Sequence, residues 1–337
     1  MVEQLMRGYE RKRISPRCMI KLDLRKACDS VNWDFLRSML VGLGFPDLVV
    51  RWIMECVTSV SYTVSVNGVT KGFFPGMRRL RQGDPLSPYH FVICMEYLSR
   101  LLHVRAMEQE LNFHPMCHVH KLTHLIFADD LMLFSRGDVA SVRTLATTVL
   151  EFGRASGLLV NNLKSNLFLA GVHVADRTSI EEEFRFATGT FPFRYLGIPL
   201  AASKLRVLNY QPLLDKIEHA IGVWKGHTLS YAGRLEILKA VVQGTCCYWL
   251  SIFSIPITVI GYIEDMARDF LWDTAKPKVS WEYLCKPKAD GGLGLRCFRT
   301  WNRSLLGKDL WDIHLKKDSL WIQWVNEFYL KGTAVWE

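Results

Sequence analysis

Two adjacent aspartates, Asp129 and Asp130, interrupt an otherwise apolar stretch that spans residues 124–134. Apolar residues on both sides of a short polar pair are typical of two strands joined by a tight turn. We therefore predict a β-hairpin with both carboxylates at its bend. Two anions held together by a buried hairpin repel each other unless a divalent cation lies between them. Two interpretations are open: a magnesium site for phosphate chemistry, or a plain turn in which Asp makes local hydrogen bonds.

A third aspartate, Asp23, ends a second predicted strand. In the segment 18–24, apolar residues at even positions alternate with a second face that carries Asp23, which is the period of a half-buried strand. A helix that begins near Asp29 or Ser30 follows. Three carboxylates around two ions about 3.5–4 Å apart would form a two-metal phosphoryl-transfer site. The alternative is that Asp23 is a helix-entry residue, because Asp is common there.

A loop that is punctuated by glycine and proline, residues 80–88, is the third element. It leads into a predicted helix over 89–102, in which Pro88 suits the first turn and Ser87 the cap. The expected buried stripe of this helix includes Phe91 and Val92. Generic loops seldom combine Arg-Gln-Gly with Pro-Leu-Ser-Pro, so this segment is more specific than either acidic element alone.

Five segments resemble, in the same order, the motifs of the reverse transcriptases of non-long-terminal-repeat retrotransposons, the long interspersed elements, and most of all their plant members. These segments are 21–30, 81–88, 127–130, 156–165 and 195–200. Residues 229–234 and 248–249 are similar to the thumb segment that follows in plant elements. The resemblance covers nearly the whole chain, and five motifs in order are far more specific than any one of them. The chain is identified as a member of this family that lacks the N-terminal part.

The resemblance implies an α+β fold: a polymerase palm, which is an antiparallel sheet with helices on one face, followed by a helical thumb. We expect a basic leader without fingers over residues 1–17, a palm over 18–200, a helical thumb over 201–275, and a basic, tryptophan-rich extension over 276–337. Within the palm, the sequence predicts helices over 46–60 and 139–156 and a hairpin that turns at Asn67-Gly68.

The resemblance also implies roles for individual residues. Asp23 and Asp129 would be the principal ligands of two Mg²⁺ ions, with Asp130 as a weaker third, and Lys164 would lie near the departing pyrophosphate. The residues implied to bind the incoming nucleotide are Leu24, Cys28, Arg81, Gln82 and Gly83. The residues implied to grip the primer are Tyr195, Leu196 and Gly197. The implied reaction is attack of a DNA primer 3′-hydroxyl on the α-phosphate of a dNTP, directed by an RNA template.

Each implied role has a simpler alternative. Lys164 is also compatible with a solvated lysine after a turn, and Gln82 with an amide that stabilises its own loop. The segment 195–200 is compatible with an apolar turn in which Gly197 and Pro199 break a strand.

Two residues depart from the family pattern. Cys28 stands where the family usually has Tyr or Phe, whose ring blocks the ribose 2′-hydroxyl, so the smaller thiol predicts weaker exclusion of ribonucleotides. Arg79, in the run 78–81, stands where the family usually has glycine, and a side chain resists the positive φ that glycine supplies. These departures and the missing fingers predict weak or no primer extension by the isolated chain.

Two further function classes are open. One, which these departures and the missing fingers support, is a catalytically inactive retrotransposon remnant that at most binds nucleic acid. The other is a palm-fold nucleotide cyclase, which would not explain the loop 81–88.

Charge favours a polyanionic partner. The formal net charge is +9 and the isoelectric point is about 9.1, which suits an RNA template, a DNA primer and a dNTP. From 276 to 317, ten Lys/Arg stand against four Asp/Glu, and Trp281, Trp301 and Trp311 lie among them. This pattern is compatible with a surface that binds single strands. We favour the alternative of a solvated face over ordinary core tryptophans.

Cysteine usage and hydropathy indicate the compartment. Nine cysteines show no paired C-x-x-C spacing and no secretory leader precedes them, so we expect free thiols in the nucleus or cytoplasm rather than secretion. The apolar segment 240–263 is interrupted by Gln243 and Pro256, so we predict a buried thumb helix that ends before Pro256 and no membrane span. The sequence leaves protein partners unidentified.

Overall fold

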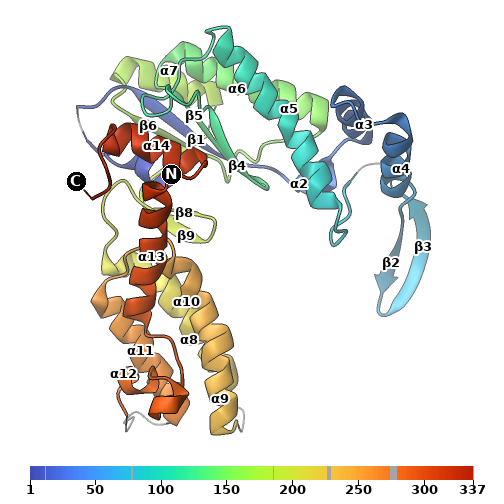
Figure 1. Ribbon diagram of the computed structural model, residues 1–337. Helices are drawn as coiled ribbons and strands as arrows, with labels where there is room; N and C mark the ends of the chain where they lie inside the picture. Colours follow the sequence, from blue (N-terminus) through green and yellow to red (C-terminus); the bar gives the residue numbers. More distant parts are fainter. Residues whose placement is uncertain (12, 77–78, 185, 226–228, 274–278, 337) are drawn as a thin grey trace. The chain divides into compact units, whose positions relative to one another are not determined.

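The computed structural model describes residues 1–11, 13–76, 79–184, 186–225, 229–273 and 279–336. The chain divides into two compact units: Val2–Leu196, and Gly197–Glu337 together with Met1. Figure 1 draws both units as ribbons.

A five-stranded sheet organises the N-terminal unit (Figure 1). Its strands in spatial order are β4 (His124–Phe127), β5 (Asp130–Arg136), β1 (Arg17–Asp23), β6 (Asn166–Ala170) and β7 (Ala187–Thr188). The central strand β1 is antiparallel to both of its neighbours, whereas β6 and β7 are parallel. The sheet is therefore antiparallel apart from its last strand, in agreement with the expected α+β class.

Helices cover one face of this sheet. The even-numbered side chains of β1, such as Ile20 and Leu22, are fully buried in a core that also contains Leu98 of α5 and Phe152 of α6. The helices of this unit are α1 (Val2–Met6), α2 (Ala27–Ser30), α3 (Trp33–Gly42), α4 (Asp47–Thr58), α5 (Ser87–Met107), α6 (Val139–Ser156) and α7 (Val174–Phe184). Strand alternation and helical periodicity thus bring their apolar faces together, as the sequence predicts.

Side chains on the opposite face of the sheet are also buried. Met19 and Phe134 are fully buried there, and the His114 ring packs edge-on against Phe134. The Tyr9 hydroxyl and His114 Nε2 share a hydrogen bond of 3.0 Å. Burial, aided by the nearby Arg17 cation, lowers the pKa of His114 to about 3, so this ring is neutral. The N-terminal residues therefore pack as part of this unit.

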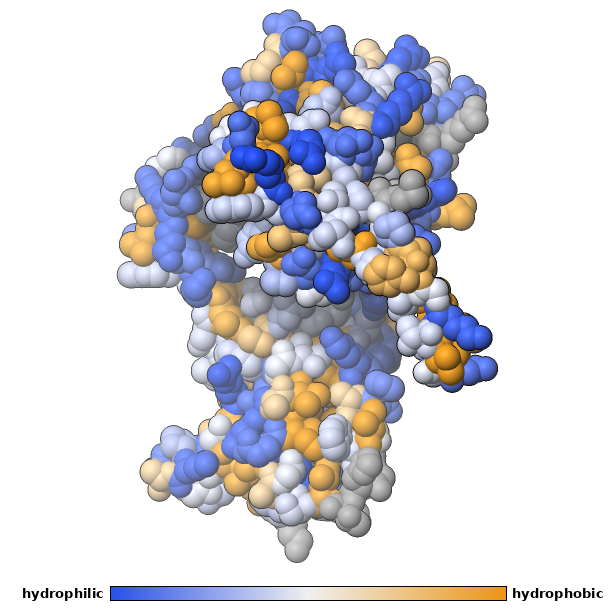
Figure 2. Space-filling view, turned by 90° about the vertical axis from the view of Figure 1, so that its right-hand side faces the viewer, coloured by the Kyte–Doolittle hydropathy of each residue, from blue (hydrophilic) through white to orange (hydrophobic). Residues whose placement is uncertain are grey.

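A two-stranded hairpin, β2 (Ser61–Val66) and β3 (Val69–Pro75), extends from the same unit. It turns at Asn67 and Gly68, whose φ angles of 50° and 79° are those of a tight hairpin turn. This confirms the predicted turn. The hairpin lies on the side of the molecule that faces the viewer in Figure 2, and several of its large apolar side chains are exposed: Val64, Val66, Val69, Phe73 and Phe74.

The C-terminal unit is mainly helical. After β8 (Phe193–Tyr195) of the first unit, its elements are β9 (Ile198–Leu200), η1 (Val207–Tyr210), α8 (Gln211–Lys225), α9 (Tyr231–Ile237), η2 (Leu238–Val242), α10 (Gln243–Leu250), α11 (Ile257–Trp272), α12 (Trp281–Leu284), η3 (Lys288–Asp290), α13 (Phe298–His314), α14 (Leu320–Val325) and η4 (Asn326–Leu330). Buried Asn302 of α13 donates from Nδ2 to the carbonyls of Leu250 (2.6 Å) and Phe253 (2.8 Å). This side chain therefore satisfies backbone groups at the end of α10.

The tryptophans of the basic C-terminal region have different environments. Trp281 is 4% exposed and its ring stacks on Phe298, so it is a core residue. Arg296 lies over the Trp301 ring at 4.3 Å, and Trp311 is 54% exposed. The prediction that the tryptophans of this region are core residues therefore holds for Trp281 but not for Trp311. Lys276, in the same basic region, lies outside the described residues.

Two further observations concern thiols and membranes. All nine cysteines are unpaired, as the sequence predicts. Over the part of the chain that the structure describes, no helix combines the length and the apolar character needed to cross a bilayer.

Candidate active site

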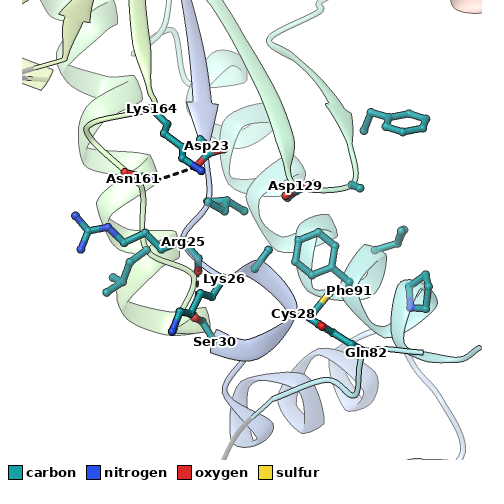
Figure 3. Close-up of a pocket in the computed structure, with 18 residues that line it drawn as sticks. Asp23, Arg25, Lys26, Cys28, Ser30, Gln82, Phe91, Asp129, Asn161 and Lys164 are labelled. Atoms are coloured by element: carbon teal, nitrogen blue, oxygen red, sulfur yellow. Dashed lines mark hydrogen bonds between the residues drawn. The ribbon is translucent and has the colours of Figure 1, made fainter. Parts of the chain in front are cut away.

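A cavity of about 910 Å³ lies at the end of β1 within the N-terminal unit. Its walls come from the residues after β1, the start of α5, the turn between β4 and β5, and the segment after α6. Figure 3 shows the side chains that line it. The cavity brings together six residues to which the sequence analysis gives roles: Asp23, Leu24, Cys28, Gln82, Asp129 and Lys164.

The hairpin between β4 and β5 places its two aspartates differently. Phe127 pairs with Asp130, so the two-residue turn is Ala128 and Asp129, and Ala128 has a φ of 51°. Asp129 lines the cavity with Asp23. Asp130 begins β5 and is the direct ladder partner of Asp23 on β1. Opposite residues of an antiparallel pair point to the same face, so Asp130 lies beside Asp23 on the sheet rather than at the bend.

Neighbouring charges influence the Asp130 carboxylate. Burial raises the pKa of Asp130; the Lys21 cation lowers it, and the carboxylates of Asp129 and Asp23 raise it. Carboxylate oxygens are the donors that Mg²⁺ prefers, so the chemistry of this set fits the ion. Among the described His, Cys, Asp and Glu residues, however, no three converge at a distance that would hold a metal. Two carboxylates share the cavity, and the third stands next to it.

The segment that follows α6 holds Asp23 in place. Asn161 Nδ2 donates to Asp23 Oδ2 at 3.0 Å, and the Asp23 backbone N–H donates to Ser165 Oγ at 3.1 Å. From the sequence, Lys164 of this segment has a predicted role, whereas Asn161 has none. Asn161 belongs to the same family motif, 156–165, but its partner Asp23 is far away in the sequence.

Three cations line the cavity: Arg25, Lys26 and Lys164. None of the ion pairs formed between described residues involves them. Unpaired cations in a cavity that also holds carboxylates suit a ligand with several phosphates. Only Lys164 is predicted from the sequence to have a role here, because Arg25 and Lys26 have the pattern of an ordinary polar connection.

Cys28, Gln82 and Phe91 lie at the other end of the cavity from Asn161 and Lys164 (Figure 3). Burial raises the pKa of the Cys28 thiol, and the carboxylates of Asp129 and Asp29 add to this, so the thiol stays neutral. The cavity therefore has a charged end and a less polar end.

The start of α5 differs from the expectation. The helix begins at Ser87, two residues before the predicted start, and the Asp84 carboxylate accepts the backbone N–H of Leu86 at 2.8 Å. Val92 is not buried in the core but 64% exposed, and its side chain lines the cavity. Helical periodicity alone could not separate a core position from a cavity wall.

The loop before α5 is tied to α2. The backbone N–H of Leu80 donates to the Cys28 carbonyl at 2.7 Å, and Arg79 pairs with Asp29 at 2.8 Å. Arg79 has a φ of 119°, a value that favours glycine, so the backbone is strained at this position. Gly83, with a φ of 89°, and Arg81 follow in this loop but do not line the cavity. Residue 78 lies outside the described residues.

The expected primer-grip residues form a turn. Tyr195 is 7% exposed at the end of β8, and Leu196 and Gly197 both have positive φ, 48° and 81°. Tyr195 and Leu196 do not line the cavity. The boundary between the two compact units falls inside this turn.

Comparisons with known proteins find relatives of this chain. A family model described as reverse transcriptase (RNA-dependent DNA polymerase) matches residues 2–200. A retrovirus-related Pol polyprotein from the type-1 retrotransposable element R2 of Popillia japonica is 26% identical over 329 residues, which is 94% of this chain and 52% of the relative. An Arabidopsis thaliana protein named for ribonuclease H is 31% identical over 140 residues, 40% of this chain and 23% of the relative. The chain spans about half or less of these relatives.

A solved structure of telomerase from Candida tropicalis with a fragment of telomeric RNA aligns with 97% of this chain and 51% of that chain. The identity is 12% and the TM-score is 0.42, which is too low to support a functional argument.

Proposed function

We propose a function for this chain on the basis that it belongs to the reverse transcriptase (RNA-dependent DNA polymerase) family and resembles the reverse transcriptases of non-long-terminal-repeat retrotransposons. Its cavity would transfer nucleotides from a dNTP to a primer 3′-hydroxyl. An RNA template would direct the reaction. The observation that carries the proposal is that Asp23 and Asp129, distant in the sequence, line one cavity with Lys164 and Gln82.

The carboxylates would hold the metal. Asp23 and Asp129 would be the main ligands of two Mg²⁺ ions, with Asp130 as a third. When bound, Mg²⁺ would lower the pKa of the attacking hydroxyl and neutralise charge on the leaving pyrophosphate. The side chains of the site would bind and orient the substrates.

The remaining residues of the cavity would bind the dNTP. Lys164, Arg25 and Lys26 supply cations for its phosphates. At the other end, Cys28 and Gln82 would face the sugar, with Leu24 on the cavity wall. Arg81 and Gly83 would hold the loop that carries Gln82 rather than contact the nucleotide themselves.

The two compact units would have different roles in the proposed reaction. The palm would span residues 18–200, most of which lie in the sheet unit, and residues 1–17 would be its basic leader. Residues 201–275 would form the thumb and 276–337 a basic extension, and Tyr195, Leu196 and Gly197 would support the primer end. The net charge of +9 supports binding of RNA and DNA, and the unpaired cysteines favour a reducing compartment, the nucleus or cytoplasm.

A primer-extension assay tests the proposal. We expect weak extension of a DNA primer on an RNA template with dNTPs, dependent on Mg²⁺ and lost in Asp129→Ala. Extension that survives Asp129→Ala contradicts the assigned site. Absence of extension by the native chain at every Mg²⁺ concentration rejects independent polymerase activity.

A second candidate is a catalytically inactive remnant that binds nucleic acid. It is favoured by the lack of three converging metal ligands among the described residues and by the strained Arg79 backbone. Tight binding of a primer–template duplex without extension, unchanged in Asp129→Ala, would favour this candidate.

A further inference from the structure

We infer that Asn161 is a positioning residue, whose side-chain amide orients the Asp23 carboxylate toward the cation that the proposed reaction needs. The inference rests on the proposed function and deepens it, because it names a residue that acts on the metal through another residue. Asn161 itself need not contact the substrate or the ion.

The backbone brings the two residues together. After α6, the segment 157–165 runs antiparallel to the end of β1. Arg25 N–H donates to the Leu159 carbonyl at 2.8 Å, and Asn161 N–H donates to the Asp23 carbonyl at 2.8 Å. Between these bonds, Leu24 and Val160 form an isolated bridge. The Asp23 backbone is thus fixed from this side by a short extension of the sheet, and by β5 on the other side.

The Asn161 side chain then fixes the carboxylate. Its Nδ2 donates to Asp23 Oδ2 at 3.0 Å, as the dashed line in Figure 3 shows. None of the hydrogen bonds between described side chains engages Oδ1 of Asp23. A neutral amide is suited to this task, because it orients the carboxylate and leaves its charge for a cation. An arginine or lysine here would itself neutralise that charge.

Asn161 also anchors the turn that carries Lys164. Its carbonyl accepts the backbone N–H groups of Lys164 (3.1 Å) and Ser165 (3.0 Å) and the Ser165 hydroxyl (2.8 Å). The Ser165 Oγ in turn accepts the backbone N–H of Asp23 at 3.1 Å. These bonds use only the Asn161 backbone, so a change of its side chain leaves them in place. A substitution therefore isolates the contact with the carboxylate.

The chain contains a matched control in the next residue. Asn162 has the same side chain, is exposed, and does not line the cavity. We would measure Mn²⁺ binding to the full chain by calorimetry, since Mn²⁺ is a close substitute for Mg²⁺ at oxygen ligands. The Mg²⁺ dependence of primer extension would be measured in parallel, with thermal unfolding of each variant as a check on folding.

We expect Asn161→Ala to raise the Kd for Mn²⁺ roughly tenfold, the usual scale for loss of a group that orients a metal ligand. The Mg²⁺ concentration needed for half-maximal extension should rise as well. Asn162→Ala should change the Kd less than about twofold. If Asn161→Ala does not fold, Asn161→Ser, whose shorter side chain lacks the amide, should show the same loss.

The outcomes separate this inference from the proposed function. Unchanged Mn²⁺ affinity in a folded Asn161 variant overturns the inference and leaves the metal site standing. An equal loss in Asn162→Ala also overturns it, because the effect would not depend on the Asp23 contact. Failure of the native chain to bind Mn²⁺ overturns both the metal site and the positioning role.

Discussion

Asp23 and Asp129 line the same cavity, but the protein holds them in different ways. Asp23 ends the central strand, where β5, Asn161 and Ser165 contact it. Asp129 lies in an exposed two-residue turn, and no hydrogen bond or ion pair among the described residues fixes its carboxylate. The sheet therefore fixes the position of Asp23, whereas Asp129 lies in a turn that a bound ion would help to order.

The physical basis of this difference is the hydrogen bonding of the backbone. A central strand has neighbours on both sides, which fix the position and direction of each side chain. A two-residue turn has backbone hydrogen-bond partners only at its base, and the positive φ of Ala128 costs conformational energy. We therefore expect substitutions that shift a side chain to be more harmful at Asp23 than at Asp129.

The largest effect is expected from removal of either charge. Asp23→Asn and Asp129→Asn should each reduce primer extension by on the order of 100-fold or more, the scale for loss of a charge-stabilising group in an active site. The exposed Asp176 of α7 supplies the control Asp176→Asn, which should leave the rate unchanged. Equal activity of Asp129→Asn and the native chain would show that the turn takes no part in the chemistry.

Longer side chains at positions 23 and 129 should have unequal effects. Asp23→Glu should lower extension roughly tenfold more than Asp129→Glu, because the sheet and Asn161 prevent the longer carboxylate at position 23 from readjusting. Steady-state rates at saturating Mg²⁺ provide the measurement. A larger loss in Asp129→Glu than in Asp23→Glu would reverse the assignment of the rigid and adjustable walls.

Cys28 provides a test of the end of the cavity that we propose to hold the sugar. Cys28→Tyr should increase the preference for dNTPs over ribonucleotides about tenfold, because a ring would fill space that the thiol leaves open. Cys28→Ala, which keeps the side chain small, is the control and should leave the preference unchanged. Competition between the two nucleotide types gives the ratio. Complete exclusion of ribonucleotides by the native chain would refute the steric argument.

The smallest effect concerns the stability of the loop wall. Arg79→Gly should raise the free energy of unfolding by about 0.5–1 kcal/mol, because relief of strain at a φ of 119° outweighs a partly exposed ion pair with Asp29. Arg79→Ala keeps the strain and loses the pair, so it should be slightly destabilising. Urea denaturation measures both. Greater stability of the alanine variant than of the glycine variant would contradict the strained backbone.

Local signals in the sequence were sufficient for much of the fold. The helix Val139–Ser156 has the predicted bounds, and the hairpin turns at Asn67 and Gly68 as expected. The alternation that ends at Asp23 correctly assigns Ile20 and Leu22 of β1 to the core under the helices, although Met19, on the same face as the carboxylate, is also buried. These features depend on side-chain periodicity and turn preferences within a few residues, which a single sequence displays directly.

Only the tertiary structure shows how the residues of the site come together. The ladder register places Asp130 opposite Asp23 and leaves Asp129 in the turn, and the segment after α6 supplies Asn161. Val92 lies on the cavity wall although its helical position suggested the core. Each of these depends on contacts between segments far apart in the chain, whose register is set by the packing of the whole sheet and its helices. Local periodicity carries no information about such contacts.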